Sequence, residues 1–263
     1  MKAALTEKPG PIGVFDSGYG GLTILHEIRQ LMPQYDYLYL GDNALTPYGT
    51  RSFEVVYEFT REAVQKLFDL GCHLVILACN TASAKALKTI QQNDLPQMEG
   101  ETRRVLGVIR PTAECIGQIT HSRHVGILAT SGTISSGSYP LEIRKLYPDI
   151  VVSGEACPMW VPLVENYEYD SPGADYFVEK RIGNLLRKDP AIDTIVLGCT
   201  HYPLLLNKIL KYTPRNVRIV PQGEYVAYSG TCRFLTTESP DKFMESASIF
   251  LRQHVEAERV VLE

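Results

Sequence analysis

The feature that most constrains this fold is a pair of apolar runs, residues 74–79 and 194–199, that each end at a cysteine. Both runs contain β-branched residues and lack polar alternation, which is typical of strands buried on both faces of a parallel sheet. Asn-Thr follows the first cysteine and Thr-His follows the second, before a helix-like segment in each case. Ligands of such sheets bind just beyond the carboxyl ends of the strands. The sequence therefore predicts that Cys79 and Cys199 lie at ligand-binding positions in two similar units.

A second repeated pattern supports two related halves. Residues 13–18 and residues 126–132 both run from a short apolar strand into a turn containing serine and glycine. This repeat and the cysteine repeat occur in the same order and with similar offsets, so the chain is predicted to contain two related α/β halves.

Periodicity and turn residues predict the remaining elements. The segment 91–104 is polar and is predicted to be a linker, after which the strand pattern starts again. Residues 157–165 are too rich in proline for a central strand and are predicted to form an ordered loop. Further strands are expected at residues 12–15, 37–40, 105–109 and 125–129, and helices at residues 22–32, 52–70, 174–187 and from residue 239 onward.

Composition limits the class of protein. A chain of 263 residues with 44% hydrophobic and 21% charged residues is typical of a soluble globular protein with one or two α/β domains. A net charge of -4 and scattered basic residues do not favour nucleic acid as the main partner. No apolar run approaches the roughly 20 residues of a membrane span, and the first nine residues are too polar for a signal peptide.

The six cysteines do not form a disulfide framework, because none has Cys-x-x-Cys spacing and the chain is long. We expect reduced thiols and a cytoplasmic protein. The commonest role of any one of these cysteines is that of a small buried apolar residue.

Three chemistries compete for Cys79 and Cys199. A cysteine and His201 could form a nucleophile for acyl transfer, which would leave the other cysteine unused. A metal site made by both thiols and His201 is disfavoured because no closely spaced ligand pair exists. In the third interpretation the two thiols face each other across a carbon acid, and one removes a proton while the other donates one. This arrangement inverts a stereocentre and needs no cofactor.

Two carboxylates are candidates to assist the thiols. Asp16 lies in the glycine-containing turn after the first strand, where it is either a proton-handling group or a helix N-cap. Glu165 ends an apolar run and is either a surface residue or a functional carboxylate.

Several short motifs, considered together, allow a comparison with a known family. They are Asp16-Ser17-Gly18, Pro47-Tyr48-Gly49, Cys79-Asn80-Thr81, residues 130–133, residues 161–165 and Cys199-Thr200-His201. In this order, from about residue 11 to the C-terminus, they resemble the glutamate racemases of the aspartate/glutamate racemase superfamily.

The resemblance implies cofactor-independent interconversion of L- and D-glutamate, which supplies D-glutamate for peptidoglycan synthesis and cell wall formation. Cys79 would accept the proton from D-glutamate and Cys199 from L-glutamate. Asp16 would assist Cys79 and His201 would assist Cys199, with Glu165 nearby. The substrate-binding residues would be Asp16, Ser17, Pro47, Tyr48, Gly49, Asn80, Thr81, Thr130, Thr133, Thr200 and His201.

The resemblance also implies two α/β domains related by pseudo-two-fold symmetry, with the active site in the cleft between them. The first would comprise residues 1–101 and 216–263, and the second residues 102–215. A homodimer is expected, with glutamate as a small-molecule partner and no metal or membrane. The alternatives are an aspartate racemase of the same superfamily and an amino-acid-binding protein without catalytic activity.

Overall fold

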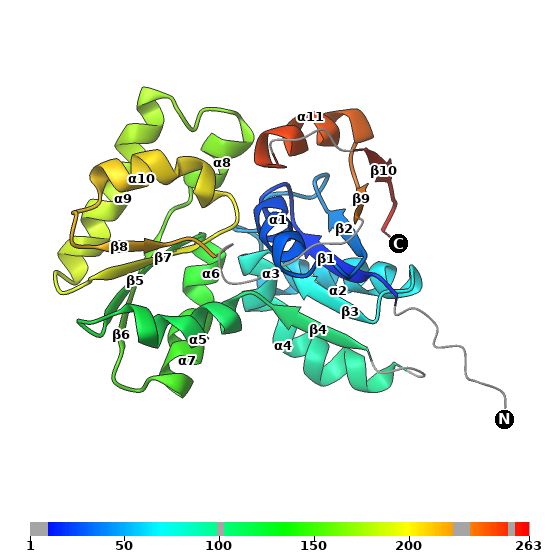
Figure 1. Ribbon diagram of the computed structural model, residues 1–263, viewed down its shortest axis with the longest axis horizontal. Coiled ribbons are helices and arrows are strands. Elements are labelled where there is room, and N and C mark those ends of the chain that lie inside the picture. The colour runs from blue at the N-terminus through cyan, green and yellow to red at the C-terminus, as the bar shows by residue number, and fades with distance from the viewer. Residues whose placement is uncertain (1–9, 99–102, 223–231, 252–255, 263) are drawn as a thin grey trace.

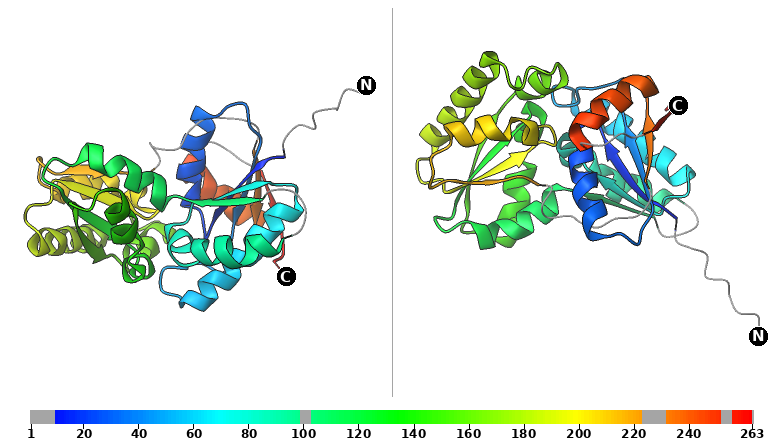
Figure 2. Two further views of the ribbon diagram at one scale, coloured as in Figure 1. Left: turned by 90° about the horizontal axis from the view of Figure 1, so that it is seen from below. Right: turned by 45° about the horizontal axis from the view of Figure 1, so that its top comes forward.

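The computed structural model describes residues 10–98, 103–222, 232–251 and 256–262. These residues form two lobes that lie side by side, each built on its own sheet (Figure 1). Two further views show the same separation of the lobes (Figure 2). Within the described ranges, no helix is long and apolar enough to cross a membrane.

The first lobe contains a six-stranded sheet in which every pair of neighbouring strands is parallel. Its helices cover both faces of the sheet, as a parallel sheet requires. The strand order is β10 (Ala257–Arg259), β9 (Cys232–Thr236), β2 (Tyr37–Gly41), β1 (Ile12–Asp16), β3 (Leu74–Leu77) and β4 (Arg104–Gly107). The helices are α1 (Gly21–Leu31), α2 (Phe53–Asp69), α3 (Asn80–Lys85), α4 (Leu87–Thr89), η1 (Ile90–Asp94), η2 (Leu95–Gln97) and α11 (Pro240–Leu251).

The second lobe contains a four-stranded sheet that is also parallel throughout. The strand order is β6 (Val151–Ala156), β5 (His124–Ala129), β7 (Thr194–Gly198) and β8 (Arg218–Val220). The helices are α5 (Ile109–Ile119), α6 (Ser131–Ser136), α7 (Ser138–Leu146), α8 (Trp160–Glu165), α9 (Pro172–Lys188), η3 (Tyr202–Leu205) and α10 (Leu206–Tyr212). The prediction of two parallel-sheet α/β units is confirmed.

Apolar side chains of the central strands enter cores on both faces of each sheet. Successive side chains of a strand point to opposite faces. In the first lobe Phe15 and Leu40 therefore join one core, and Val14 and Tyr39 join the other. The second sheet likewise separates two cores, with Leu197 in one of them and Val196 in the other. Strands buried on both faces explain why these segments are apolar at consecutive positions.

Two local predictions are wrong. Within the predicted linker 91–104, residues 91–97 form helical turns and Arg104 begins β4, while residues 99–102 lie outside the described residues. Residues 160–165 of the predicted loop form helix α8 (Trp160–Glu165). Pro162 lies in the first turn of that helix, where a backbone N–H has no intrahelical acceptor, so proline is tolerated there.

The strand pairing also bears on where the chain passes between the lobes. β4 pairs with β3 in the first sheet, and β8 pairs with β7 in the second. Both strands lie just beyond the boundaries near residues 102 and 216 that the sequence suggested. We therefore propose that the chain crosses to the second lobe at about residue 108 and returns after Val220.

Helix α11 packs on the first lobe. Its Phe243, Ala247 and Leu251 are buried in the same core as Leu25 of α1. The i, i+4, i+8 spacing of these three residues places them on one face of the helix. The helix predicted from residue 239 onward is confirmed.

Candidate active site

Both predicted cysteines lie at one cavity between the lobes. Cys79 follows β3 of the first sheet and is the N-cap residue of α3, while Cys199 follows β7 of the second sheet. The cavity has a volume of about 60 Å³. It is lined by Ser17, Thr46, Pro47, Tyr48, Gly49, Thr50, Cys79, Asn80, Thr81, Thr130, Ser131, Cys157, Pro158, Val161, Pro162, Cys199, Thr200 and His201.

The Cys79 thiol has neutral hydrogen-bonding neighbours. The cysteine is 5% exposed. Its Sγ lies 3.3 Å from the Ser17 hydroxyl and accepts the Ala82 backbone N–H over 3.4 Å. Burial raises the pKa of this thiol to about 12, and the nearby Asp16 carboxylate adds to the increase, while the Ser17 and Ala82 contacts oppose it. These surroundings favour the protonated form of the Cys79 thiol.

The Cys199 thiol has an ionisable neighbour. The cysteine is 7% exposed, and its Sγ lies 3.9 Å from His201 Nδ1. The other ring nitrogen of His201 contacts Glu165 Oε1 at 2.5 Å. Burial alone would lower the pKa of His201, but the contacts with Cys199 and Glu165 outweigh it and raise the pKa well above its usual value. His201 is therefore held as an imidazolium within reach of the Cys199 sulfur.

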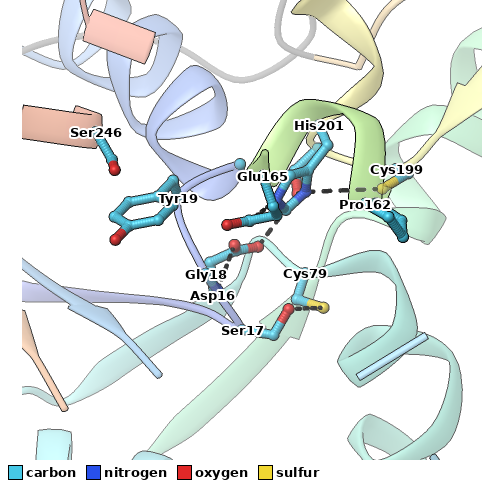
Figure 3. A network of polar contacts seen from close by, with 12 residues as sticks. Asp16, Ser17, Gly18, Tyr19, Cys79, Pro162, Glu165, Cys199, His201 and Ser246 are labelled. Atoms are coloured by element: carbon cyan, nitrogen blue, oxygen red, sulfur yellow. Dashed lines mark hydrogen bonds and ion pairs between the residues drawn. The ribbon is translucent and has the colours of Figure 1, made fainter. Parts of the chain in front are cut away.

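Asp16 lies between these two arrangements (Figure 3). It is fully buried, accepts the Gly18 N–H over 3.0 Å, and accepts a longer bond of 3.4 Å from the Thr200 hydroxyl of the other lobe. Burial raises the pKa of its carboxyl group, although His201 and backbone N–H groups oppose the increase. The N-cap residue of α1 is Gly20, so Asp16 is not that N-cap, although it interacts with the Gly21 N–H.

Hydroxyl groups of the two lobes meet at the cavity wall. The Thr81 and Thr130 hydroxyls lie 2.9 Å apart, and Thr130 donates to the Thr133 hydroxyl over 3.1 Å. The Gly132 N–H of the second lobe donates to the Gly49 carbonyl of the first over 2.8 Å. A Cβ atom at Gly49 would lie 2.8 Å from Thr130 Cβ, so this close approach requires glycine.

The structure brings the predicted site residues together. Three of them contact residues of the lining without lining the cavity themselves: Asp16 contacts Thr200, Glu165 contacts His201, and Thr133 contacts Thr130. The other predicted residues line the cavity directly.

Sequence reasoning missed some of the lining residues. They are Thr46, Thr50, Ser131, Cys157, Pro158, Val161 and Pro162. The first three adjoin predicted residues and could have been included on that ground. The other four lie in the segment interpreted as a loop. Val161 and Pro162 belong to the motif 161–165, of which only Glu165 was assigned to the site.

The cavity can bind a small anionic ligand through neutral donors and the His201 ring. Within the described ranges, its lining includes neither lysine nor arginine. Hydroxyl groups and backbone N–H groups therefore remain to bind a carboxylate. Among the described residues, no group of three or more His, Cys, Asp or Glu side chains could hold a metal ion.

Two thiols that meet at one cavity from two parallel-sheet lobes define a class of racemase. The family model described as Asp/Glu/Hydantoin racemase matches residues 22–223. This chain belongs to that family.

Its relatives point to a particular member. The chain is 36% identical to a glutamate racemase of Roseobacter denitrificans, over 93% of this chain and 98% of the relative. The crystal structure of glutamate racemase isoform RacE1 from Bacillus anthracis has a TM-score of 0.89 and 33% identity, covering 97% of this chain and 99% of that one. The Francisella tularensis glutamate racemase, solved in complex with D-glutamate, has a TM-score of 0.85 and 29% identity. The match covers 97% of this chain and 98% of that one.

Proposed function

We propose that this chain is a glutamate racemase, an isomerase that interconverts L- and D-glutamate. The observation that carries the proposal is the pair of buried thiols, Cys79 and Cys199, which reach one cavity from opposite lobes. Membership of the racemase family and the similarity to named glutamate racemases over most of the chain support the same substrate.

The reaction has two proton transfers. A thiolate removes the α-proton, so the Cα–H bond breaks and its electrons pass into the neighbouring carboxylate. The opposite thiol then gives its proton to the other face of Cα. We assign the first step for D-glutamate to Cys79 and for L-glutamate to Cys199. Each turnover leaves the two sulfurs with exchanged protonation states, so each cysteine must act both as an acid and as a base.

The surroundings of the thiols make the proton transfers feasible. We propose that His201 exchanges a proton with Cys199 or stabilises its thiolate, since Nδ1 lies 3.9 Å from the sulfur. Glu165 holds the imidazole ring through Nε2. Asp16 assists on the Cys79 side, next to Ser17. No cofactor is needed in this scheme, because the carbanion is stabilised by donors fixed in a site that excludes water.

Substrate binding is assigned to polar groups in and around the cavity. Hydroxyl, amide and backbone N–H groups can donate to the two carboxylates of the substrate, while hydroxyl and carboxylate oxygens can accept from its amino group. The proposed set is Asp16, Ser17, Pro47, Tyr48, Gly49, Asn80, Thr81, Thr130, Thr133, Thr200 and His201.

We also propose that the enzyme supplies D-glutamate for peptidoglycan synthesis, acts in the cytoplasm and forms a homodimer. The family supports the first of these roles. Sedimentation of the purified protein tests the oligomeric state.

Proton NMR in D₂O tests the central proposal. Purified protein is incubated with L-glutamate without added cofactor, and the same sample is then analysed by chiral chromatography. We expect loss of the α-proton signal together with the appearance of D-glutamate. Exchange with aspartate but not glutamate would keep the mechanism and change the substrate. No exchange with either amino acid, in folded protein, would indicate a binding protein instead.

A further inference from the structure

A closed ring of hydrogen bonds joins Asn80, Tyr139 and Gln222. Tyr139 donates its hydroxyl hydrogen to Asn80 Oδ1 over 2.7 Å. Asn80 Nδ2 donates to Gln222 Oε1 over 2.5 Å, and Gln222 Nε2 donates back to the Tyr139 oxygen over 2.6 Å. Gln222 Nε2 also donates to the Thr112 hydroxyl over 3.0 Å, and that hydroxyl donates to the Val108 carbonyl.

The ring permits one orientation of its amides. An amide nitrogen only donates and an amide oxygen only accepts. Turning the Asn80 amide alone would place its oxygen against Gln222 Oε1. Turning both amides would place Gln222 Oε1 against the Thr112 hydroxyl oxygen, whose only hydrogen is donated to the Val108 carbonyl. All four side chains are buried, with exposures of 2% for Asn80, 2% for Thr112, 1% for Tyr139 and 4% for Gln222. Solvent cannot replace a lost partner there, so the orientation is strongly fixed.

The ring connects the cavity to both passages between the lobes. Asn80 follows Cys79 and lines the cavity. Thr112 lies in α5, just after the chain leaves the first sheet, and Gln222 lies just after the chain leaves the second sheet at β8. The only residue of the ring that lines the cavity is Asn80.

The fixed amide leaves one donor for a ligand. Gln222 accepts one of the two N–H groups of Asn80. Across the described residues the other has no protein acceptor, and Asn80 lines the cavity. An amide turned the other way would present its oxygen and repel a carboxylate.

We propose that Gln222 is a positioning residue, which with Tyr139 fixes the Asn80 amide so that it presents an N–H group to the substrate beside Cys79. This inference rests on the proposed glutamate racemase activity. Gln222 acts only through Asn80 and does not touch the substrate.

A double-mutant cycle tests the inference. Gln222→Met keeps an unbranched side chain of similar length but removes all three hydrogen bonds. We expect kcat/KM for D-glutamate to fall about tenfold, mainly through a higher KM, because a ground-state contact is weakened. In an Asn80→Ala background the same substitution is expected to change kcat/KM less than about twofold, since the residue through which Gln222 acts is gone. The same exchange at exposed Gln34 is the control, with unchanged kinetics.

Each outcome is decisive. An equal loss in both backgrounds, or no loss in either, would overturn the positioning role while wild-type turnover leaves the proposed function intact. Absence of wild-type turnover would overturn both. The unfolding temperature shows whether Gln222→Met folds, and if it does not, Tyr139→Phe replaces it in the cycle. That variant removes both the donor to Asn80 Oδ1 and the acceptor of Gln222 Nε2. It is expected to lower kcat/KM about fivefold, again only when Asn80 is present.

Discussion

The two thiol sites share a backbone design but differ in their polar neighbours. In each lobe a buried strand ends at a cysteine, and polar residues lead into a helical segment. Cys79 contacts a serine hydroxyl and a backbone N–H, neither of which changes its charge near neutral pH. Cys199 instead contacts His201, whose charge is supported by Glu165.

This difference shows that the similarity of the two lobes does not extend to their acid–base chemistry. The reaction is symmetric in its products, because enantiomers have equal free energies. Removal of the proton by Cys79 and by Cys199 nevertheless takes place in different electrostatic surroundings. The two directions are therefore expected to have different kcat and KM values, although their kcat/KM values must agree.

Replacing either thiol should have the largest effect. Cys79→Ser and Cys199→Ser each remove one acid–base group, so racemisation should fall about a thousandfold or more. Chiral chromatography measures the product, and Cys115→Ser, a cysteine outside the cavity, is the control. Turnover close to wild type in either variant would show that the reaction does not use two bases.

Replacing the assisting groups should separate the two directions. We expect His201→Asn to lower kcat about a hundredfold from L-glutamate and less from D-glutamate, because His201 assists Cys199. Asp16→Asn should lower kcat more from D-glutamate than from L-glutamate, because Asp16 assists Cys79. Deuterium isotope effects with each α-deuterated enantiomer identify the step that has slowed. Equal losses of kcat in both directions would mean that these groups act through general electrostatics.

The Glu165 carboxylate should shift the pH profile. It contacts His201 and favours the imidazolium, so Glu165→Gln should lower the pKa of His201. The limb of the pH–rate profile that His201 governs then moves to lower pH, and an NMR titration of the ring measures the same shift. Glu168→Gln removes an exposed carboxylate nearby and is the control. An unchanged titration would show that Glu165 does not support the charge of His201.

The smallest expected effect is that of the Cys79 thiol on the free energy of unfolding at alkaline pH. The pKa of Cys79 is raised to about 12 in the folded protein, above the roughly 8.5 of an unfolded thiol. The folded state thus keeps a proton that the unfolded state releases, and stability is lost as the pH rises through this window. Between pH 9 and 10 this thiol should lower the free energy of unfolding by about 1.2 kcal/mol. Between these two pH values the free energy of unfolding of Cys79→Ala, measured by urea titration, should fall by correspondingly less. A fall equal to that of the wild type would contradict the assignment.

The sequence predicted the elements in which one physical signal dominates. Continuous apolar runs identified the central strands and, at their ends, both thiols. Most of the predicted cavity lining came from the resemblance to glutamate racemases. The sheet that β4 joins was not predictable, because a short strand with exposed Arg104 and Leu106 resembles the start of a new unit as much as an edge. The ring around Gln222 was missed because it joins residues up to 142 positions apart.

The close contact between Gly49 and Gly132 has a consequence for the timing of catalysis. Together with the Thr81–Thr130 pair it fastens one lobe to the other across a cavity with room for only a few water-sized groups. We expect these contacts to break and re-form each time an amino acid enters or leaves the cavity. If this opening limits product release, a more viscous solvent should lower kcat.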